Sequence, residues 1–207
     1  FPAILNGDFS GIIVEAGPGC DTWRVGDEVF GCAGGVDQIQ GALAEYMLVD
    51  CRLIARKPAN ITHQTAALYP LAVITAWESV MENGFAVAGD KVLVHGATGG
   101  VGHLAVQLLK LQGATVYGSV TSAAKAAIAG KYGDTVGGLH LLESFEATRP
   151  EGKICTISAR TTLDISKMHS KALTLRVVYM LLPLLNDHGR ERHGQILNRV
   201  ARLIESE

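Results

Sequence analysis

The stretch Lys91-Val-Leu-Val-His95, followed directly by Gly96-Ala-Thr-Gly-Gly-Val-Gly102, decides the fold of this chain. Its first five residues are mostly apolar, as in a buried strand. The glycines predict a tight turn, and residues 101–111 continue with apolar residues at helical spacing. Residues 114–120 predict the next strand and residues 123–131 the next helix. This order predicts a βαβ unit, and such units build parallel sheets.

Small residues in the turn fit the backbone of a dinucleotide-binding fingerprint. Ala97 takes the first position and permits the turn, and Gly99 takes the second and lets the backbone approach a diphosphate. Gly102 takes the third and lets the helix lie close to the strand. The N–H groups of Gly100 and Val101, at the positive end of the helix dipole, would then face the phosphates. The sequence therefore predicts dinucleotide binding, with a purely structural turn as the alternative.

The end of the second predicted strand indicates which dinucleotide is bound. A chain that binds NAD usually carries Asp or Glu about 20 residues beyond the fingerprint. Here Thr121, Ser122 and Lys125 supply two hydroxyls and one cation, and residues 120–125 contain no carboxylate. Such donors bind a 2′-phosphate that a carboxylate would repel, so the sequence predicts NADP, used as NADPH. The alternative is that Thr121 or Ser122 caps the next helix while Lys125 is solvated.

Two regions of the chain differ in their residue patterns. Residues 1–61 contain short β-like runs at 11–15, 27–30 and 44–49, broken by Gly, Asp and Pro, which predict part of an irregular β domain. Residues 62–207 alternate helices and strands. We expect this second region to be the dinucleotide-binding domain.

Several helices and one strand are expected in the second region. Thr62 predicts the cap of a helix that Pro70 interrupts, and residues 74–81 predict a further helix. Residues 173–182 predict a strand, and the apolar residues within 196–204 predict one face of an amphipathic helix.

Composition and charge exclude some classes of function. The chain has 207 residues and a formal net charge of −2, which gives no electrostatic reason for a nucleic-acid surface. The sequence shows no apolar run near the roughly 20 residues that cross a bilayer, so we expect no membrane partner. Single cysteines without zinc-like spacing predict reduced, mostly buried thiols in a cytoplasmic protein. They are Cys20, Cys32, Cys51 and Cys155.

Four histidines are candidate metal ligands by residue type, but their spacing does not fit a shared metal site. We expect each of them to be a surface or hydrogen-bonded residue instead. They are His95, His103, His188 and His193.

Several stretches together carry a family resemblance. They are Pro2-Ala-Ile-Leu-Asn-Gly-Asp-Phe-Ser-Gly11, Val25-Gly-Asp-Glu-Val-Phe-Gly31, Gly41-Ala-Leu-Ala-Glu-Tyr46, Val94-His-Gly-Ala-Thr-Gly-Gly-Val-Gly102, Asp134-Thr-Val-Gly-Gly138 and Gly152-Lys-Ile-Cys155. In combination they resemble the medium-chain dehydrogenase/reductase superfamily, in particular its zinc-independent quinone oxidoreductase (zeta-crystallin-like) branch. The resemblance implies an α/β fold, in which a Rossmann-type doubly wound parallel sheet accompanies an irregular, chaperonin-10-like β catalytic domain.

The resemblance also implies an activity, hydride transfer from NADPH to a quinone or conjugated enone. It places Thr75 near the nicotinamide, with an intrahelical hydrogen bond as the alternative role, and Ser158 and Arg160 beside it. No general acid is assigned. Family analogy further suggests a homodimer joined through residues 173–182. A zinc-free alcohol or enoyl reductase with another acceptor, or a non-catalytic NADP-binding scaffold, are the alternative functions.

The sequence departs from its family at identifiable points. Zinc alcohol dehydrogenases carry a Gly-His-Glu motif where this chain has Gly7-Asp8-Phe9, so no metal site is expected. Gly133 runs straight into Asp134, where the family has a further strand and helix, and we expect a segment to be omitted there. Both domains therefore look incomplete, and the family's return into the catalytic domain is expected to be missing after Glu207.

Overall fold

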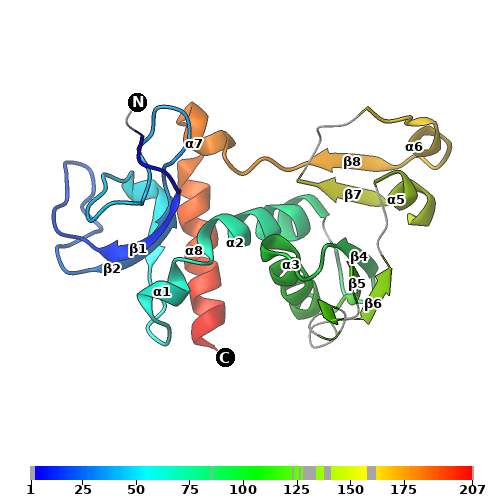
Figure 1. Cartoon of the computed structure of the whole chain (residues 1–207), viewed down its shortest axis with the longest axis horizontal. Helices are drawn as coiled ribbons and strands as arrows, with labels where there is room; N and C mark the ends of the chain where they lie inside the picture. Colours follow the sequence, from blue (N-terminus) through cyan, green and yellow to red (C-terminus); the bar gives the residue numbers. More distant parts are fainter. Residues whose placement is uncertain are drawn as a thin grey trace. The chain divides into compact units, whose positions relative to one another are not determined.

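The computed structural model describes residues 3–84, 86–122, 124, 125, 127, 134–137, 141–157 and 162–206, without the side chains of 134–137. The chain forms two compact units (Figure 1). Unit 1 consists of Phe1–Ile74 and Met180–Glu207, and unit 2 consists of Thr75–Tyr179. The sequence predicts one domain over 62–207, whereas the structure groups both ends of that range with the N-terminal residues.

Unit 1 contains a three-stranded antiparallel sheet. Its strands are β1 (Asp8–Ile12), β2 (Glu28–Cys32) and β3 (Ile54–Arg56), in the order β1-β2-β3. Phe30 lies opposite both Ser10 and Ala55 and is fully buried. The predicted runs at 11–15 and 27–30 overlap β1 and β2. The third, residues 44–49, belongs to no strand, and its Leu48 is 95% exposed.

The C-terminal helix packs on the N-terminal sheet of unit 1. Helix α8 (Arg190–Glu205) follows the short α7 (Leu182–Asn186) and contacts β3 and the 3-10 helix η1 (Cys51–Leu53). Its buried face includes Ile196, Leu197 and Val200, as the amphipathic pattern predicts. At Gly194 a Cβ would lie 2.6 Å from the Arg52 carbonyl oxygen, so only glycine permits this approach. From the sequence we expect the return into the catalytic domain to be missing after Glu207, and Met180–Glu207 already group with unit 1.

Proline and threonine set the helix boundaries that precede unit 2. Thr62 Oγ1 accepts a hydrogen bond from Thr65 N at 3.2 Å and caps α1 (His63–Ala66), as predicted. Pro70 begins α2 (Pro70–Trp77), since proline lacks an N–H and fits the first helical turn. The π-helix η2 (Glu78–Gly84) follows, so the predicted helix at 74–81 is divided between two elements.

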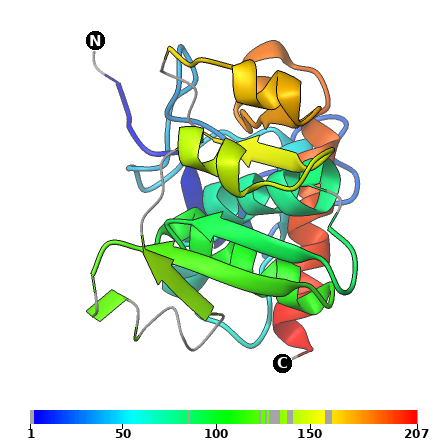
Figure 2. The same ribbon diagram turned by 90° about the vertical axis from the view of Figure 1, so that its right-hand side faces the viewer.

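The central part of unit 2 is a parallel sheet covered by one long helix. Strands β4 (Lys91–His95), β5 (Thr115–Val120) and β6 (Asp134–Gly137) are parallel and lie side by side (Figure 2). Helix α3 (Gly100–Leu111) packs against β4 and β5. This confirms the predicted βαβ unit, except that the helix at 123–131 falls mostly outside the described residues. The core between sheet and helix contains Ala97, Val106, Leu109 and Val116.

A second parallel pair completes unit 2. Strands β7 (Lys153–Thr156) and β8 (Thr174–Val177) pair together; α5 (Leu141–Ala147) precedes β7 in the sequence, and α6 (Ser166–Ser170) lies between the two strands. Strand β8 lies within the predicted 173–182. The resemblance implies one doubly wound sheet, whereas the described strands form two separate parallel sheets. The predicted omission between residues 133 and 134 falls at a boundary of the described residues.

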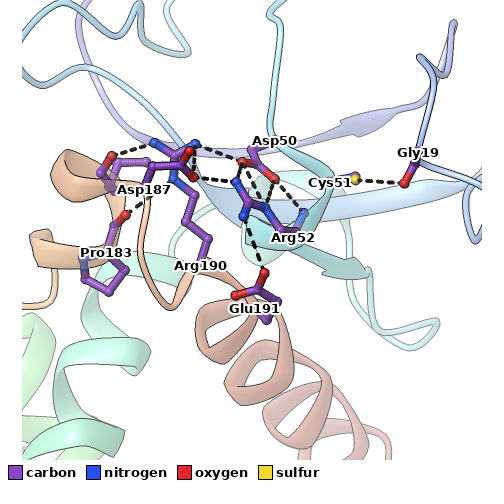
Figure 3. A network of polar contacts seen from close by, with 9 residues as sticks. Gly19, Asp50, Cys51, Arg52, Pro183, Asp187, Arg190 and Glu191 are labelled. Carbon is purple, nitrogen blue, oxygen red and sulfur yellow. Dashed lines mark hydrogen bonds and ion pairs between the residues drawn. The ribbon is translucent and has the colours of Figure 1, made fainter.

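A cluster of charges fastens η1 to the beginning of α8 (Figure 3). Asp50 caps η1, and its Oδ2 lies 2.6 Å from Arg52 Nη2 and 2.8 Å from Arg190 Nη1. Asp187 pairs with both arginines, and Glu191 pairs with Arg52. The side chains of Asp50 and Arg190 are 19% and 17% exposed, so water screens this ion pair only in part.

Hydrogen bonds hold the pKa of Asp50 well below its usual range. The bond from Arg52 contributes most, and burial opposes it, while Arg190 adds a second bond. A carboxyl whose pKa is depressed by folding stabilises the protein above its unfolded-state pKa. That contribution is lost as the pH falls through the folded-state value.

Replacing Asp50 with Asn should lower the free energy of unfolding by about 1–2 kcal/mol at pH 7, because two partly buried guanidinium groups lose a shared carboxylate. Urea denaturation followed by circular dichroism measures the loss. The difference in unfolding free energy between the variant and the wild-type chain should narrow below about pH 4, where the stabilising contribution of the wild-type carboxylate begins to be lost. Asp187→Asn is the matched control, because that side chain is 65% exposed. Equal losses of unfolding free energy for the two variants would contradict the conclusion that the partly buried Asp50 carboxylate stabilises the cluster more than Asp187 does.

Candidate functional site

The glycine-rich turn joins the carboxyl end of β4 to the first turn of α3. Gly99 is the N-cap residue of α3 in an extended conformation, and its N–H donates to Gly96 O at 2.8 Å. Because glycine has no side chain, nothing from residue 99 caps the amides of the helix. Gly99 and Gly100 are exposed, and the beginning of the helix is therefore open to solvent at these residues.

Two glycines are needed for this geometry. Gly96 has φ +66°, a conformation that residues with side chains adopt rarely. At Gly102 a Cβ would lie 2.1 Å from the Gly96 carbonyl oxygen, so a side chain there would push α3 away from the turn. Ala97 is buried, and its N–H donates to Ser119 O of β5 at 3.1 Å, which ties the turn to the neighbouring strand.

The first turn of α3 presents amides that have no partner inside the helix. An α-helix leaves its first N–H groups unpaired, and its dipole adds a partial positive charge at the same end. Gly100, Val101 and Gly102 occupy this first turn. An anion such as a diphosphate is the ligand that suits open amides of this kind.

The residues predicted to select the cofactor follow β5 directly. Lys125 Nζ donates to Thr121 Oγ1 at 3.2 Å, and Lys125 N donates to Ser122 Oγ at 3.3 Å. All three residues are exposed. Since β4 and β5 are parallel and His95 lies opposite Ser119, both strands end at the same edge of the sheet. The structure thus places these three residues beyond the sheet edge that carries the glycine turn, while Ser122 also has the local capping role that the sequence left open.

Of the three residues predicted to lie near the nicotinamide, Thr75 is among the described residues. Thr75 lies in α2, is 5% exposed, and its carbonyl oxygen accepts a hydrogen bond from Ser79 Oγ at 2.7 Å. Ser158 and Arg160 lie outside the described residues.

Sequence reasoning did not find the hydrogen-bonding arrangement around His95. Its Nδ1 lies 3.0 Å from Ser119 Oγ, and its Nε2 lies 2.9 Å from Ser144 Oγ. The imidazole therefore connects the ends of β4 and β5 with α5, next to the glycine turn. This agrees with the expectation of a hydrogen-bonded histidine. Its serine partners are 24 and 49 residues away along the chain, and no local pattern identifies them.

Asp8 lies in the stretch Gly7-Asp8-Phe9, which differs from the Gly-His-Glu motif of zinc alcohol dehydrogenases. Its Oδ1 accepts a hydrogen bond from Leu71 N at 2.8 Å. Burial raises the pKa of Asp8, while the Leu71 amide and the Cys32 thiol lower it in part. Burial, and then the neighbouring Asp8 charge, raises the pKa of Cys32. Among the described residues, no three His, Cys, Asp or Glu side chains form a group that could hold a metal ion.

Within the part of the chain that the structure describes, no helix is both long enough and apolar enough to cross a bilayer.

Parts of this chain are similar in sequence to known proteins. Residues 1–59 match the family model of the alcohol dehydrogenase GroES-like domain. A 2-methylene-furan-3-one reductase from Solanum lycopersicum is 35% identical over 151 residues, which cover 70% of this chain and 38% of that enzyme. The chain spans between 2% and 38% of the length of the first curated relatives that it matches.

Solved structures extend the likeness over the whole chain. The quinone oxidoreductase of Escherichia coli, complexed with NADPH, is 22% identical with a TM-score of 0.81, and the match covers 100% of this chain and 72% of that one. At that identity the likeness concerns the fold. An alcohol dehydrogenase superfamily protein from Novosphingobium aromaticivorans is 30% identical with a TM-score of 0.95. Since this match covers 100% of the chain and 70% of that relative, the chain belongs to the medium-chain dehydrogenase/reductase superfamily.

Proposed function

We propose that this chain is part of an NADPH-dependent oxidoreductase that transfers hydride to a quinone or a conjugated enone without catalytic zinc. The observation that carries the proposal is the open beginning of α3, where exposed glycines leave the amides accessible. Membership of the superfamily and the dinucleotide fingerprint support the same activity.

The residues at the turn fit the diphosphate of a dinucleotide. Gly99 presents no side chain to the space in front of the helix, and the amides of Gly100, Val101 and Gly102 would donate hydrogen bonds to phosphate oxygens. Ala97 supports this arrangement by fastening the turn to β5. The backbone therefore supplies the binding groups, and the small side chains allow the ligand to approach.

The residues after β5 favour NADPH over NADH. The Lys125 ammonium lies against the Thr121 hydroxyl, and Ser122 adds a second hydroxyl nearby. A 2′-phosphate would gain a cation and hydroxyl donors at this place. The described residues between Ser119 and Lys125 include no carboxylate that would repel it.

Bound NADPH would supply the hydride, and the protein would orient the nicotinamide and exclude water from the acceptor. We infer that Thr75, together with Ser158 and Arg160, lies on the nicotinamide side. The acceptor class is inferred from the names of two similar proteins, a quinone oxidoreductase and a furanone reductase. Both names describe substrates with a conjugated, electron-poor carbonyl system.

We also propose that two copies of the chain associate through β8. This strand is at one end of the two-stranded sheet β7-β8, and its Val177 is 55% exposed. Within the described part of the chain β8 pairs with β7 alone, so its other edge could pair with a second copy.

Replacing Gly99 with Asp should weaken NADPH binding at least 100-fold while the chain stays folded. Aspartate is a favourable N-cap residue, so its carboxylate would satisfy the helix amides and repel the diphosphate at once. Its Cβ would meet only the Gly96 carbonyl oxygen, at 3.2 Å. Isothermal titration calorimetry with NADPH measures the loss.

Two further variants separate charge from shape at residue 99. Gly99→Asn offers a cap of the same size without the negative charge, so it should weaken NADPH binding less than Gly99→Asp does. Gly99→Ala should weaken NADPH binding least. Wild-type affinity in folded Gly99→Asp would refute the placement of the diphosphate.

The activity itself is tested by following the absorbance of NADPH and NADH with a panel of quinones, conjugated enones, saturated aldehydes and alcohols. We expect oxidation of NADPH by quinones or enones, with slower turnover of NADH. Consumption of saturated aldehydes alone would point to another acceptor class. Tight NADPH binding without turnover of any acceptor would indicate a binding role and overturn the proposed reaction.

A further inference from the structure

Two cysteines far apart in the sequence meet in unit 1. Cys20 lies in the loop that connects β1 to β2, and Cys51 is the first residue of η1. Burial, and then interaction with the neighbouring Cys20 thiol, raises the pKa of the Cys51 thiol. Cys51 Sγ also lies 4.0 Å from the carbonyl oxygen of Gly19, the residue before Cys20 (Figure 3).

Backbone and side-chain bonds hold the two segments together around this pair. Trp23 Nε1 donates to the Cys51 carbonyl oxygen at 3.3 Å. Trp23 N donates to Cys20 O at 2.9 Å, and Cys20 N donates to Gly17 O at 3.3 Å, so the loop is folded into successive turns at the cysteine. The indole thus anchors the segment of Cys20 to the segment of Cys51 independently of the thiols.

Neither cysteine is fully buried, and both line the same cavity. Cys20 and Cys51 are each half-buried, and both line a cavity of about 250 Å³ that is also lined by residues 9–17 and 44–49. Cys32, by contrast, is 1% exposed, and burial followed by the neighbouring Asp8 charge raises its pKa. The expectation that the cysteines are mostly buried therefore holds for Cys32 but is wrong for this pair.

We propose that Cys20 and Cys51 form a redox-active dithiol that a peroxide converts into an intramolecular disulfide. In the first step one sulfur attacks a peroxide oxygen and the O–O bond breaks. A sulfenic acid forms, and water or an alcohol leaves. In the second step the other sulfur attacks the sulfenic sulfur, the S–O bond breaks, the S–S bond forms, and water leaves. Two thiols have then lost two protons and two electrons, and the electrons have reduced the peroxide.

The surroundings indicate how this pair should react. Burial raises the pKa of the Cys51 thiol to about 11, helped by its hydrogen bond and charge interaction with Cys20 and by the Asp50 charge. The thiolate of Cys51 is therefore scarce near neutral pH, and the reaction should be slow. Once one sulfur is oxidised, the contact with the second favours disulfide formation over further oxidation.

The disulfide would close a loop that includes β2 and the cavity-lining residues 44–49. It would connect the loop of Cys20 to η1, beside the cluster of Asp50, Arg52 and Arg190. A crosslink between residues this far apart stabilises a protein chiefly by restricting its unfolded state.

Peptide mapping tests the proposal directly. The purified chain is treated with hydrogen peroxide, its remaining thiols are alkylated under denaturing conditions, and the non-reduced digest is analysed by mass spectrometry. We expect one linked peptide pair containing Cys20 and Cys51, and a thermal unfolding midpoint raised by about 5 °C, which dithiothreitol reverses.

Matched variants make the test specific. Cys20→Ser and Cys51→Ala should each abolish the linked peptides and the rise in the midpoint, whereas Cys155→Ser should preserve both. The wild-type digest is decisive even if a variant fails to fold. Recovery of Cys20 and Cys51 as separately alkylated or separately oxidised peptides, or as links between two chains only, would overturn the proposal.

Discussion

The close approach of α3 to the turn after β4 is the constraint on which the candidate site depends. It exists because residue 102 is glycine, since a Cβ at this position would collide with the Gly96 carbonyl oxygen at 2.1 Å. With that contact in place, α3 begins at the carboxyl end of β4, and Gly99 and Gly100 at its beginning are open to solvent. The hydrogen bond from Ala97 to Ser119 then aligns the end of β5 with the turn. Backbone geometry, rather than any catalytic side chain, thus defines the site.

Unit 1 is held together by a different kind of interaction. Its sheet is small, and its C-terminal helix reaches η1 through a glycine contact at residue 194 and through the charges of Asp50, Arg52 and Arg190. The paired thiols of Cys20 and Cys51 lie next to this cluster. A segment distant in sequence is therefore secured both by the buried apolar face of α8, which includes Ile196, Leu197 and Val200, and by these polar contacts.

The sequence predicts best what local patterns determine. The limits of β4, α3 and β5 follow from apolar spacing and from glycines whose conformational role is local. The capping of α1 by Thr62 follows from the same kind of pattern. The amphipathic pattern of α8 predicts a buried face, but not that this face meets η1 and β3, because a helical stripe does not specify its partner. Residues 44–49 resemble a strand by composition, yet a strand also requires a neighbouring backbone.

The candidate site likewise contains features that local sequence patterns predict and features that depend on residues far apart in the chain. The fingerprint glycines and the candidates Thr121, Ser122 and Lys125 each lie within a few residues of one another and could be identified from the sequence, whereas the contact of Lys125 with Thr121 is seen only in the structure. The hydrogen bonds of His95 to Ser119 and Ser144 join residues from three elements and could not. Fold and fingerprint together support one central claim, that the first amides of α3 hold the diphosphate of a dinucleotide. The direct measurement is a nitrogen-15 NMR titration of the labelled chain with NADPH. Saturable shifts of the amides of Gly99, Gly100, Val101 and Gly102, with those of α8 unchanged, are predicted. Saturable NADPH binding that leaves these four amides unshifted would contradict the account.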